Sequence, residues 1–184
     1  MFSKAFTDAD IPPGYGFKQL LFSPIAKALV VQVESVGPSW RPERLYYRHN
    51  DSEKYQLLGD PHYLSSQESP VIHQSGTLLA YNSLRHKFSV NSEGEELHSG
   101  NWDALKIFDL ERGVEVHSID RETLKLPAGV TRGWITGVVA YGDSGIFVTV
   151  SLSNDGLKMD HFVAELDLVE RTLAQIVLLP AVFM

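Results

Sequence analysis

The sequence predicts an all-β protein built from about three antiparallel four-strand meanders. Three stretches near the beginning, middle and end of the chain share one rhythm: an apolar segment, a tight turn and a second apolar segment. Their apolar segments are rich in β-branched and aromatic residues, which suits strands that face each other in a hairpin. Each of these hairpins is followed, after a polar stretch, by a second hairpin of the same kind.

The three meanders are expected at residues 17–60, 70–120 and 134–180 of one domain that spans residues 1–184. Residues 1–16 are expected to form an arm that stays mobile or packs late. The expected strands are residues 17–22, 28–33, 44–47 and 55–58, then 70–73, 77–81, 105–110 and 114–119, and finally 135–141, 146–150, 162–168 and 174–178.

The segment from residue 162 to residue 176 fits two interpretations. Apolar residues recur there at steps of four and three, as on one face of an amphipathic helix: Phe162, Leu166, Val169, Leu173 and Ile176. Apolar residues also alternate from Phe162 to Leu168, as in a strand. Comparison with the other two units favours strands.

Two aspartates, Asp109 and Asp167, each stand near the end of an expected strand and begin a similar turn. The side chain of an aspartate in this position can accept hydrogen bonds from the backbone N–H groups that follow it. We therefore expect both residues to stabilise turns and not to catalyse a reaction.

The middle unit resembles a blade of a β-propeller of the TolB or WD40-like kind. A turn containing Gly76 precedes the apolar segment 77–81, and the later segment 105–110 ends in Asp109-Leu110 before a turn containing Gly113. The resemblance covers the middle unit best. It is fair for residues 135–180 and poor for the first unit, which lacks both the Gly turn and the Asp-Leu pair.

A propeller-like arrangement of three blades raises the question of closure, because propellers have about four to eight blades. The chain would be either a partial propeller or half of a six-blade propeller formed by two chains about a twofold axis. The run of residues 176–184 carries no charged side chain, so we expect its own core or a second chain to cover it. A homodimer is therefore expected. A β-sandwich and a partly closed barrel are the alternative folds.

Composition excludes several functional classes. The chain has no cysteine, which removes disulfides, thiolate nucleophiles and Cys-ligated zinc. Its formal net charge is −7 and its Lys and Arg residues are scattered, so no nucleic-acid partner is expected and a basic protein suits it better. No apolar run is long enough to cross a bilayer and the first residues do not resemble a secretory signal, so we expect a cytoplasmic protein without a membrane partner.

The insertion at residues 84–101 is the main candidate binding site. It is a long polar segment between two expected strands, and binding residues are commonly found on loops whose ends are fixed by a sheet. Trp40 lies in the corresponding place of the first unit. The alternative is a plain surface loop. The candidate binding residues are Trp40, Arg85, His86, Lys87, Phe88, Glu95, Glu96, His98 and Trp102.

No constellation of catalytic or metal-binding residues stands out. The weak metal candidates are His49, Asp51 and His62, which lack a zinc-ligand spacing, so no cofactor is expected. Residues 142–145 read Gly-Asp-Ser-Gly and resemble the nucleophile motif of trypsin-like serine proteases, but a hairpin turn explains them. Residues 154–156 read Asn-Asp-Gly, which a turn also explains.

The absence of a catalytic pattern favours a protein-binding or scaffolding module over an enzyme. The enzyme alternative is a metal-assisted hydrolase or lyase on a propeller-like scaffold, and it expects several histidines and aspartates to converge on one cavity. A further alternative is a small acidic inhibitor of a toxin, of the kind that confers immunity.

Overall fold

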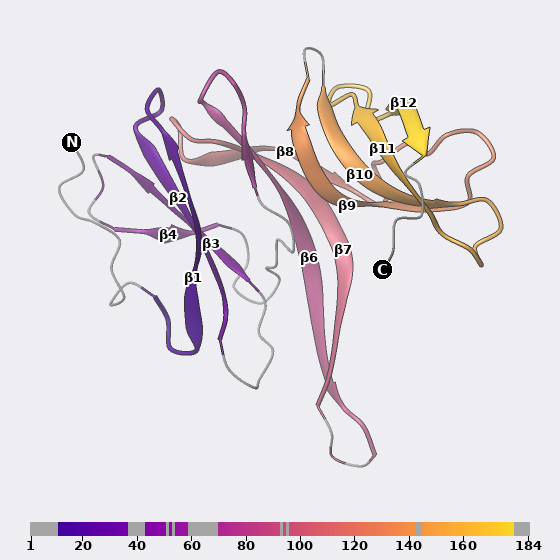
Figure 1. Cartoon of the computed structure of the whole chain (residues 1–184), viewed down its shortest axis with the longest axis horizontal. Coiled ribbons are helices and arrows are strands. Elements are labelled where there is room, and N and C mark those ends of the chain that lie inside the picture. The colour runs from indigo at the N-terminus through magenta and orange to yellow at the C-terminus, as the bar shows by residue number, and fades with distance from the viewer. Residues whose placement is uncertain are drawn as a thin grey trace.

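The computed structural model describes residues 11–36, 43–50, 52, 54–58, 70–92, 94, 96–142 and 145–178. These residues form three four-stranded antiparallel sheets that lie side by side (Figure 1), and none of them is in a helix. The predicted all-β class and the antiparallel pairing are therefore confirmed.

The first sheet consists of β1 (Tyr15–Ser23), β2 (Ala28–Ser35), β3 (Arg44–His49) and β4 (Gln56–Leu57), in that order. Every strand pairs with the next one in the chain, as a meander requires. The strand β1 begins within the expected N-terminal arm. Of that arm, residues 1–10 lie outside the described part of the chain.

The second sheet consists of β5 (Val71–Ile72), β6 (Leu78–Val90), β7 (Glu96–Asp109) and β8 (Val114–Asp120), again in chain order. The two central strands are much longer than the outer two. The prediction of a loop at residues 84–101 is wrong, because β6 and β7 continue through most of this segment as paired strands.

The third sheet has the order β12-β11-β10-β9. Its strands are β9 (Arg132–Tyr141), β10 (Ile146–Ser153), β11 (Asp160–Leu166) and β12 (Leu173–Leu178). The helix alternative for residues 162–176 is therefore wrong. Strand β11 pairs with β10 on one side and with β12 on the other, and this lateral pairing favours an extended backbone that periodicity alone could not distinguish from a helix.

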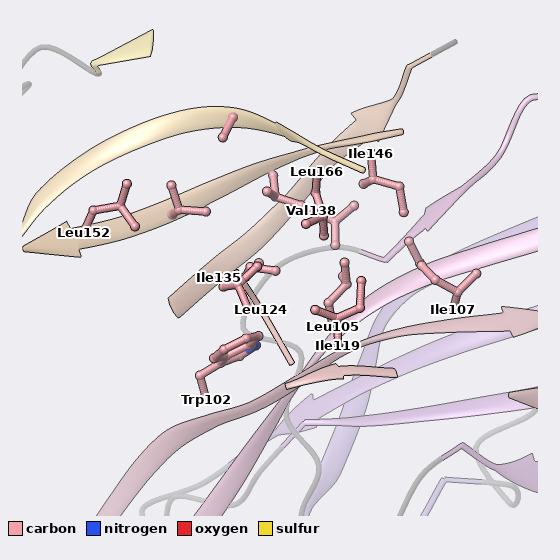
Figure 2. Close-up of a cluster of buried hydrophobic side chains, with 14 residues drawn as sticks. Trp102, Leu105, Ile107, Ile119, Leu124, Ile135, Val138, Ile146, Leu152 and Leu166 are labelled. Atoms are coloured by element: carbon pink, nitrogen blue, oxygen red, sulfur yellow. The ribbon is translucent and has the colours of Figure 1, made fainter. Parts of the chain in front are cut away.

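The larger hydrophobic core lies between the second and third sheets. Its side chains point toward one another from both sheets in Figure 2. The second sheet and the connection after it contribute Ala80, Trp102, Leu105, Ile107, Ile119 and Leu124, and the third contributes Ile135, Val138, Ile146, Val148, Val150, Leu152, Ala164 and Leu166. Burial of this apolar area holds the two sheets together.

A second core joins the first and second sheets. Leu79 and Tyr81 of β6 belong to this core, whereas Ala80 between them belongs to the larger one. Successive side chains of a strand point to opposite faces, so the second sheet is covered on both faces by its neighbours. The hydroxyl of Tyr47 in β3 also donates a hydrogen bond of 2.7 Å to the carbonyl oxygen of Leu110.

The two aspartate turns have the same geometry. Oδ1 of Asp109 accepts hydrogen bonds of 3.0 and 2.9 Å from the backbone N–H groups of Glu111 and Arg112. Oδ1 of Asp167 accepts bonds of 2.8 Å from the equivalent groups two and three residues later. The predicted structural placement of both aspartates is confirmed.

Candidate binding site on the projecting ribbon

The strands β6 and β7 form a two-stranded ribbon that extends beyond the rest of their sheet. They remain in antiparallel register over seven residue pairs, from Leu84 opposite Trp102 to Val90 opposite Glu96. Figure 1 shows this hairpin projecting away from the body of the molecule. We call residues 84–90 and 96–102 the ribbon.

Neither neighbouring strand accompanies the ribbon. The pairing of β8 with β7 ends at Ala104, and β5 pairs with β6 only at Leu79 and Ala80. Within the described ranges, the outer edges of both ribbon strands therefore have no third strand beside them. Such edges present backbone N–H and C=O groups that can pair with another chain.

A strand ribbon is possible here despite the polar sequence, because the antiparallel ladder pairs the backbone groups on the facing edges of the two strands without requiring an apolar face. The missing apolar alternation, which suggested a loop, therefore does not prevent these segments from pairing as strands. At its tip, Gly94 has a φ of +81° and donates a backbone hydrogen bond of 3.1 Å to the carbonyl oxygen of Asn91.

Seven of the candidate binding residues lie in the ribbon strands, and one of them, Trp102, is at the base of the ribbon. Arg85, His86, Lys87 and Phe88 belong to β6, and Glu96 and His98 belong to β7. In the ladder, the backbone of His86 is opposite that of Gly100, and Phe88 is opposite His98. Two further candidates, Trp40 and Glu95, lie outside the described residues.

The seventh candidate, Trp102, is a core residue at the base of the ribbon. Its side chain is 8% exposed and packs in the larger core. It was expected at the margin of a loop, but its place on β7 turns the indole toward the third sheet. Burial removes this side chain from the surface that a partner could contact.

Asn82 of β6 connects the base of the ribbon to the third sheet. Its Oδ1 accepts a hydrogen bond of 2.8 Å from Nε1 of Trp102. Its Nδ2 donates to the carbonyl oxygens of Ile135 and Thr136 in β9, at 3.3 and 3.1 Å. Sequence reasoning missed Asn82, although an asparagine directly after the apolar run ending at Tyr81 was a signal for a polar group at the edge of the core.

Of the weak metal candidates, only His49 is described. It ends β3 and lines a cavity of about 420 Å³ between the β3–β4 turn and the β7–β8 turn. The same cavity is bordered by Lys54, Arg112 and Glu111, and by Arg48, whose guanidinium carbon lies 4.8 Å from the centroid of the Tyr55 ring.

The described part of the chain contains no group of three or more His, Asp or Glu side chains placed to hold a metal ion. His49 lies in the first sheet, whereas His86 and His98 lie in the ribbon of the second sheet. Asp51 and His62 are outside the described residues. The histidines that the structure places are thus distributed over different sheets.

The two turns considered for other chemistry have backbone roles. Gly142 donates a hydrogen bond of 2.9 Å to the carbonyl oxygen of Gly145 and closes the hairpin of β9 and β10, while residues 143 and 144 lie outside the described part. Oδ1 of Asp155 accepts bonds from the N–H groups of Leu157 and Lys158, at 2.9 and 3.2 Å. These backbone hydrogen bonds lower the pKa of Asp155.

Comparisons of the chain with models of protein families, with curated proteins and with solved structures find no match. The resemblance of the middle unit to propeller blades therefore stays a prediction. In the portion that the structure covers, no helix has the length and hydropathy needed to span a membrane.

Proposed function

We propose that the chain is a protein-binding module and that the ribbon is its binding element. The observation that carries this proposal is the continuation of β6 and β7 for seven residue pairs with no strand on either side among the residues that the structure describes. A two-stranded hairpin alone is marginally stable in water at best, so a ribbon of this length gains stability when a partner packs against it or extends its ladder.

The base of the ribbon supports this role. Trp102 and Asn82 hold the start of the projecting strands against β9, so the ribbon leaves the body from a fixed origin. Because the ribbon is fixed at its base, only the ribbon strands themselves lose conformational entropy when a partner binds along their edges, and this loss is small.

The partner that we propose is a basic protein. The chain has a formal net charge of −7, and three glutamates, Glu93, Glu95 and Glu96, are grouped within four residues of the sequence. Opposite charge on the partner would accelerate association and disfavour acidic competitors.

We also propose that the three sheets correspond to blades of a partial propeller. The resemblance in residues 70–120, the chain-order pairing inside each sheet and the two cores that join successive sheets support this arrangement. Half of a six-blade ring is the alternative, and it requires a second copy to cover the outer faces of the first and third sheets.

The test uses a variant in which residues 86–100 are replaced by Asn-Gly, a pair that favours the tight turn of a two-residue hairpin. This change joins Arg85 to Asn101 and keeps Trp102 and Asn82. The matched control is Leu157→Asp, which alters a side chain that is 90% exposed in the turn between β10 and β11. Equal circular dichroism spectra and melting temperatures would show that both variants fold.

Each protein is then used for affinity purification from cell extract, and recovered proteins are purified and titrated individually. We expect a protein that binds the wild type and Leu157→Asp with equal affinity and binds the shortened variant at least tenfold more weakly. Equal binding to all three proteins would place the binding surface elsewhere and contradict the proposal. If the recovered protein is a toxin whose activity the chain abolishes, the module is an inhibitor.

A further inference from the structure

The edge strand β1 exposes a row of large apolar side chains. Phe17, Leu20 and Phe22 are 53%, 48% and 51% exposed. Their partners on β2 are Val33, Val31 and Leu29, which lie on one face of the sheet because they alternate along the strand. The row therefore lies along the edge of the outer face of the first sheet, away from the second sheet.

The centre of this outer face is already covered by the chain's own side chains. Val31 and Val33 are fully buried in a small cluster with Tyr15, against which Tyr46 and Tyr55 pack. Two guanidinium groups close over it, with Arg44 stacked at 4.7 Å on the Tyr15 ring and Arg48 stacked on the Tyr55 ring. Among the described residues of this outer face, the large exposed apolar side chains therefore lie along β1.

The backbone of β1 is suited to pairing with another strand. In the described part of the chain, β1 is the last strand of its sheet and pairs only with β2. Its one charged residue, Lys18, is bound to Glu43 at 2.6 Å and lies at a bulge. From Gln19 to Phe22 the register with β2 is regular, so these four residues form an uncharged edge of the kind that pairs with other strands. The edge ends at Ser23, which is buried and donates its hydroxyl to the carbonyl oxygen of Gly76.

We infer that two copies of this chain associate through β1, in antiparallel pairing about a twofold axis at Leu21. In this register, Leu20 of one copy is opposite Phe22 of the other and on the same face, and the reverse pair forms on the other side of the axis. The surface is therefore complementary to itself, as a twofold interface requires. The two first sheets become one continuous eight-stranded sheet.

The exposed area supports a second copy as the occupant. An aromatic side chain can bury about 150–250 Å², so the exposed halves of Phe17 and Phe22 offer about 150–250 Å² in each copy. Counted from both copies, the two phenylalanines give about 300–500 Å². Leu20 and the paired backbones add to this area, so the interface belongs to the small class below about 1,200 Å², which is typical of weak association. The inference is independent of the ribbon, which belongs to another sheet.

Sedimentation equilibrium at micromolar concentration tests the association. We expect the wild type and Leu157→Asp to have a mass near twice 20.5 kDa and Leu20→Asp to have a mass near 20.5 kDa. A wild-type mass near 20.5 kDa, or a dimer that survives Leu20→Asp, would overturn the inference. Val177→Asp, on the outer edge of the third sheet, distinguishes a dimer paired through β1 from a six-blade ring of two chains. The substitution should leave the β1-paired dimer intact but disrupt the ring.

A cross-linking experiment tests the register without a destabilising charge. The chain has no cysteine, so Leu20→Cys and Phe22→Cys each introduce a single thiol. Mixing the two variants under oxidising conditions should give a mixed disulfide in large excess over either homodimeric one, since only the mixed pair is directly opposite. Equal yields of the three products would contradict the proposed register. Sedimentation of the variant in which Asn-Gly replaces residues 86–100 is a further check. If only this variant loses the dimer, the association belongs to the ribbon and the inference is overturned.

Discussion

The indole N–H of Trp102 and the side-chain oxygen of Asn82 form a hydrogen bond of 2.8 Å at the place where the ribbon leaves its sheet. Both side chains are buried, and the amide nitrogen of Asn82 is bound to two carbonyl oxygens of β9. The amide of Asn82 in β6 thus bonds to groups on β7 and β9 and links three strands from two sheets. This contact ties the start of the projecting strands to the third sheet.

Replacing Asn82 with Leu should destabilise the fold. The substitution leaves the buried indole N–H without its acceptor, and an unsatisfied buried polar group costs about 1–3 kcal/mol. Urea unfolding followed by tryptophan fluorescence would measure the loss. Asn154→Leu, at an exposed position, is the matched control and should change the free energy of unfolding by less than about 0.5 kcal/mol. An unchanged stability of Asn82→Leu would show that the hydrogen bond does not contribute to holding the two sheets.

Asp109→Ala and Asp167→Ala should each reduce stability by about 0.5–2 kcal/mol, by analogy with side chains that cap helix N-termini. Each substitution removes an oxygen that accepts two backbone N–H bonds. The corresponding Asn variants keep an acceptor oxygen and should lose less. Thermal unfolding of the four variants checks this order, and a larger loss in Asn than in Ala would refute the capping role.

The two equivalent turns end in different residues with the same backbone conformation. Gly113 has a φ of +67° and Arg171 a φ of +59°, and each donates its backbone N–H to the carbonyl oxygen of the aspartate four residues earlier. A residue with a side chain is disfavoured in this left-handed region by about 1–2 kcal/mol, whereas glycine is not.

Arg171→Gly should therefore stabilise the protein by up to about 1 kcal/mol, after the greater freedom of glycine in the unfolded chain is subtracted. Gly113→Ala should destabilise it by a similar amount. Space does not limit the alanine, because the nearest atom to its added carbon is 3.5 Å away on Tyr47. Chemical denaturation of both variants measures the sign of each change in the free energy of unfolding. A loss of stability in Arg171→Gly would contradict the strain argument.

The Asp120 carboxylate should make stability depend on pH in the acidic range. Thr123 donates its hydroxyl and its backbone N–H to Oδ1, and Glu122 donates a third bond, at 2.8, 2.9 and 3.1 Å. These bonds, with the Thr123 hydroxyl first, lower the pKa of Asp120 in the folded protein. The charged form is therefore favoured by folding, so its contribution is complete above the unfolded pKa of about 3.9 and is lost as the pH falls through the lower folded value.

The difference in unfolding free energy between wild type and Asp120→Asn should accordingly be largest near neutral pH and should shrink below about pH 4. Urea titrations at a series of pH values measure this difference. A difference that is constant down to the acid unfolding transition would mean that the carboxylate charge is not the source of the stabilisation.

Local chemistry made much of the fold predictable. Hairpins were identifiable because apolar β-branched segments flank short turns, and Asp109 and Asp167 could be assigned from their position ahead of those turns. The segment from Phe162 to Ile176 was ambiguous because its pattern fits two periods. Its strand conformation depends on hydrogen bonds to β10, a partner that the local pattern does not specify.

The ribbon was beyond local reasoning for a physical reason. Alternation of apolar residues marks a strand only when one face is buried, and the polar sequence of residues 84–101 lacks this alternation. The choice of residues 84–101 as a binding region stays a prediction. Trp102 was assigned to the surface, since nothing in the sequence indicates that its indole packs in the core shared with the third sheet. The row of Phe17, Leu20 and Phe22 was visible only as part of a strand, because its exposure depends on which face the second sheet covers.

Hydrogen exchange of the chain, alone and in complex with the protein recovered by the wild type, tests the proposed binding role of the ribbon most directly. The backbone amides on the outer edges of residues 84–90 and 96–102 should exchange rapidly in the free chain and at least tenfold more slowly in the complex. Amides of the third sheet should be unaffected. Protection confined to the first or third sheet, with ribbon amides exchanging at the same rate in both samples, would contradict the assignment of the ribbon as the binding element.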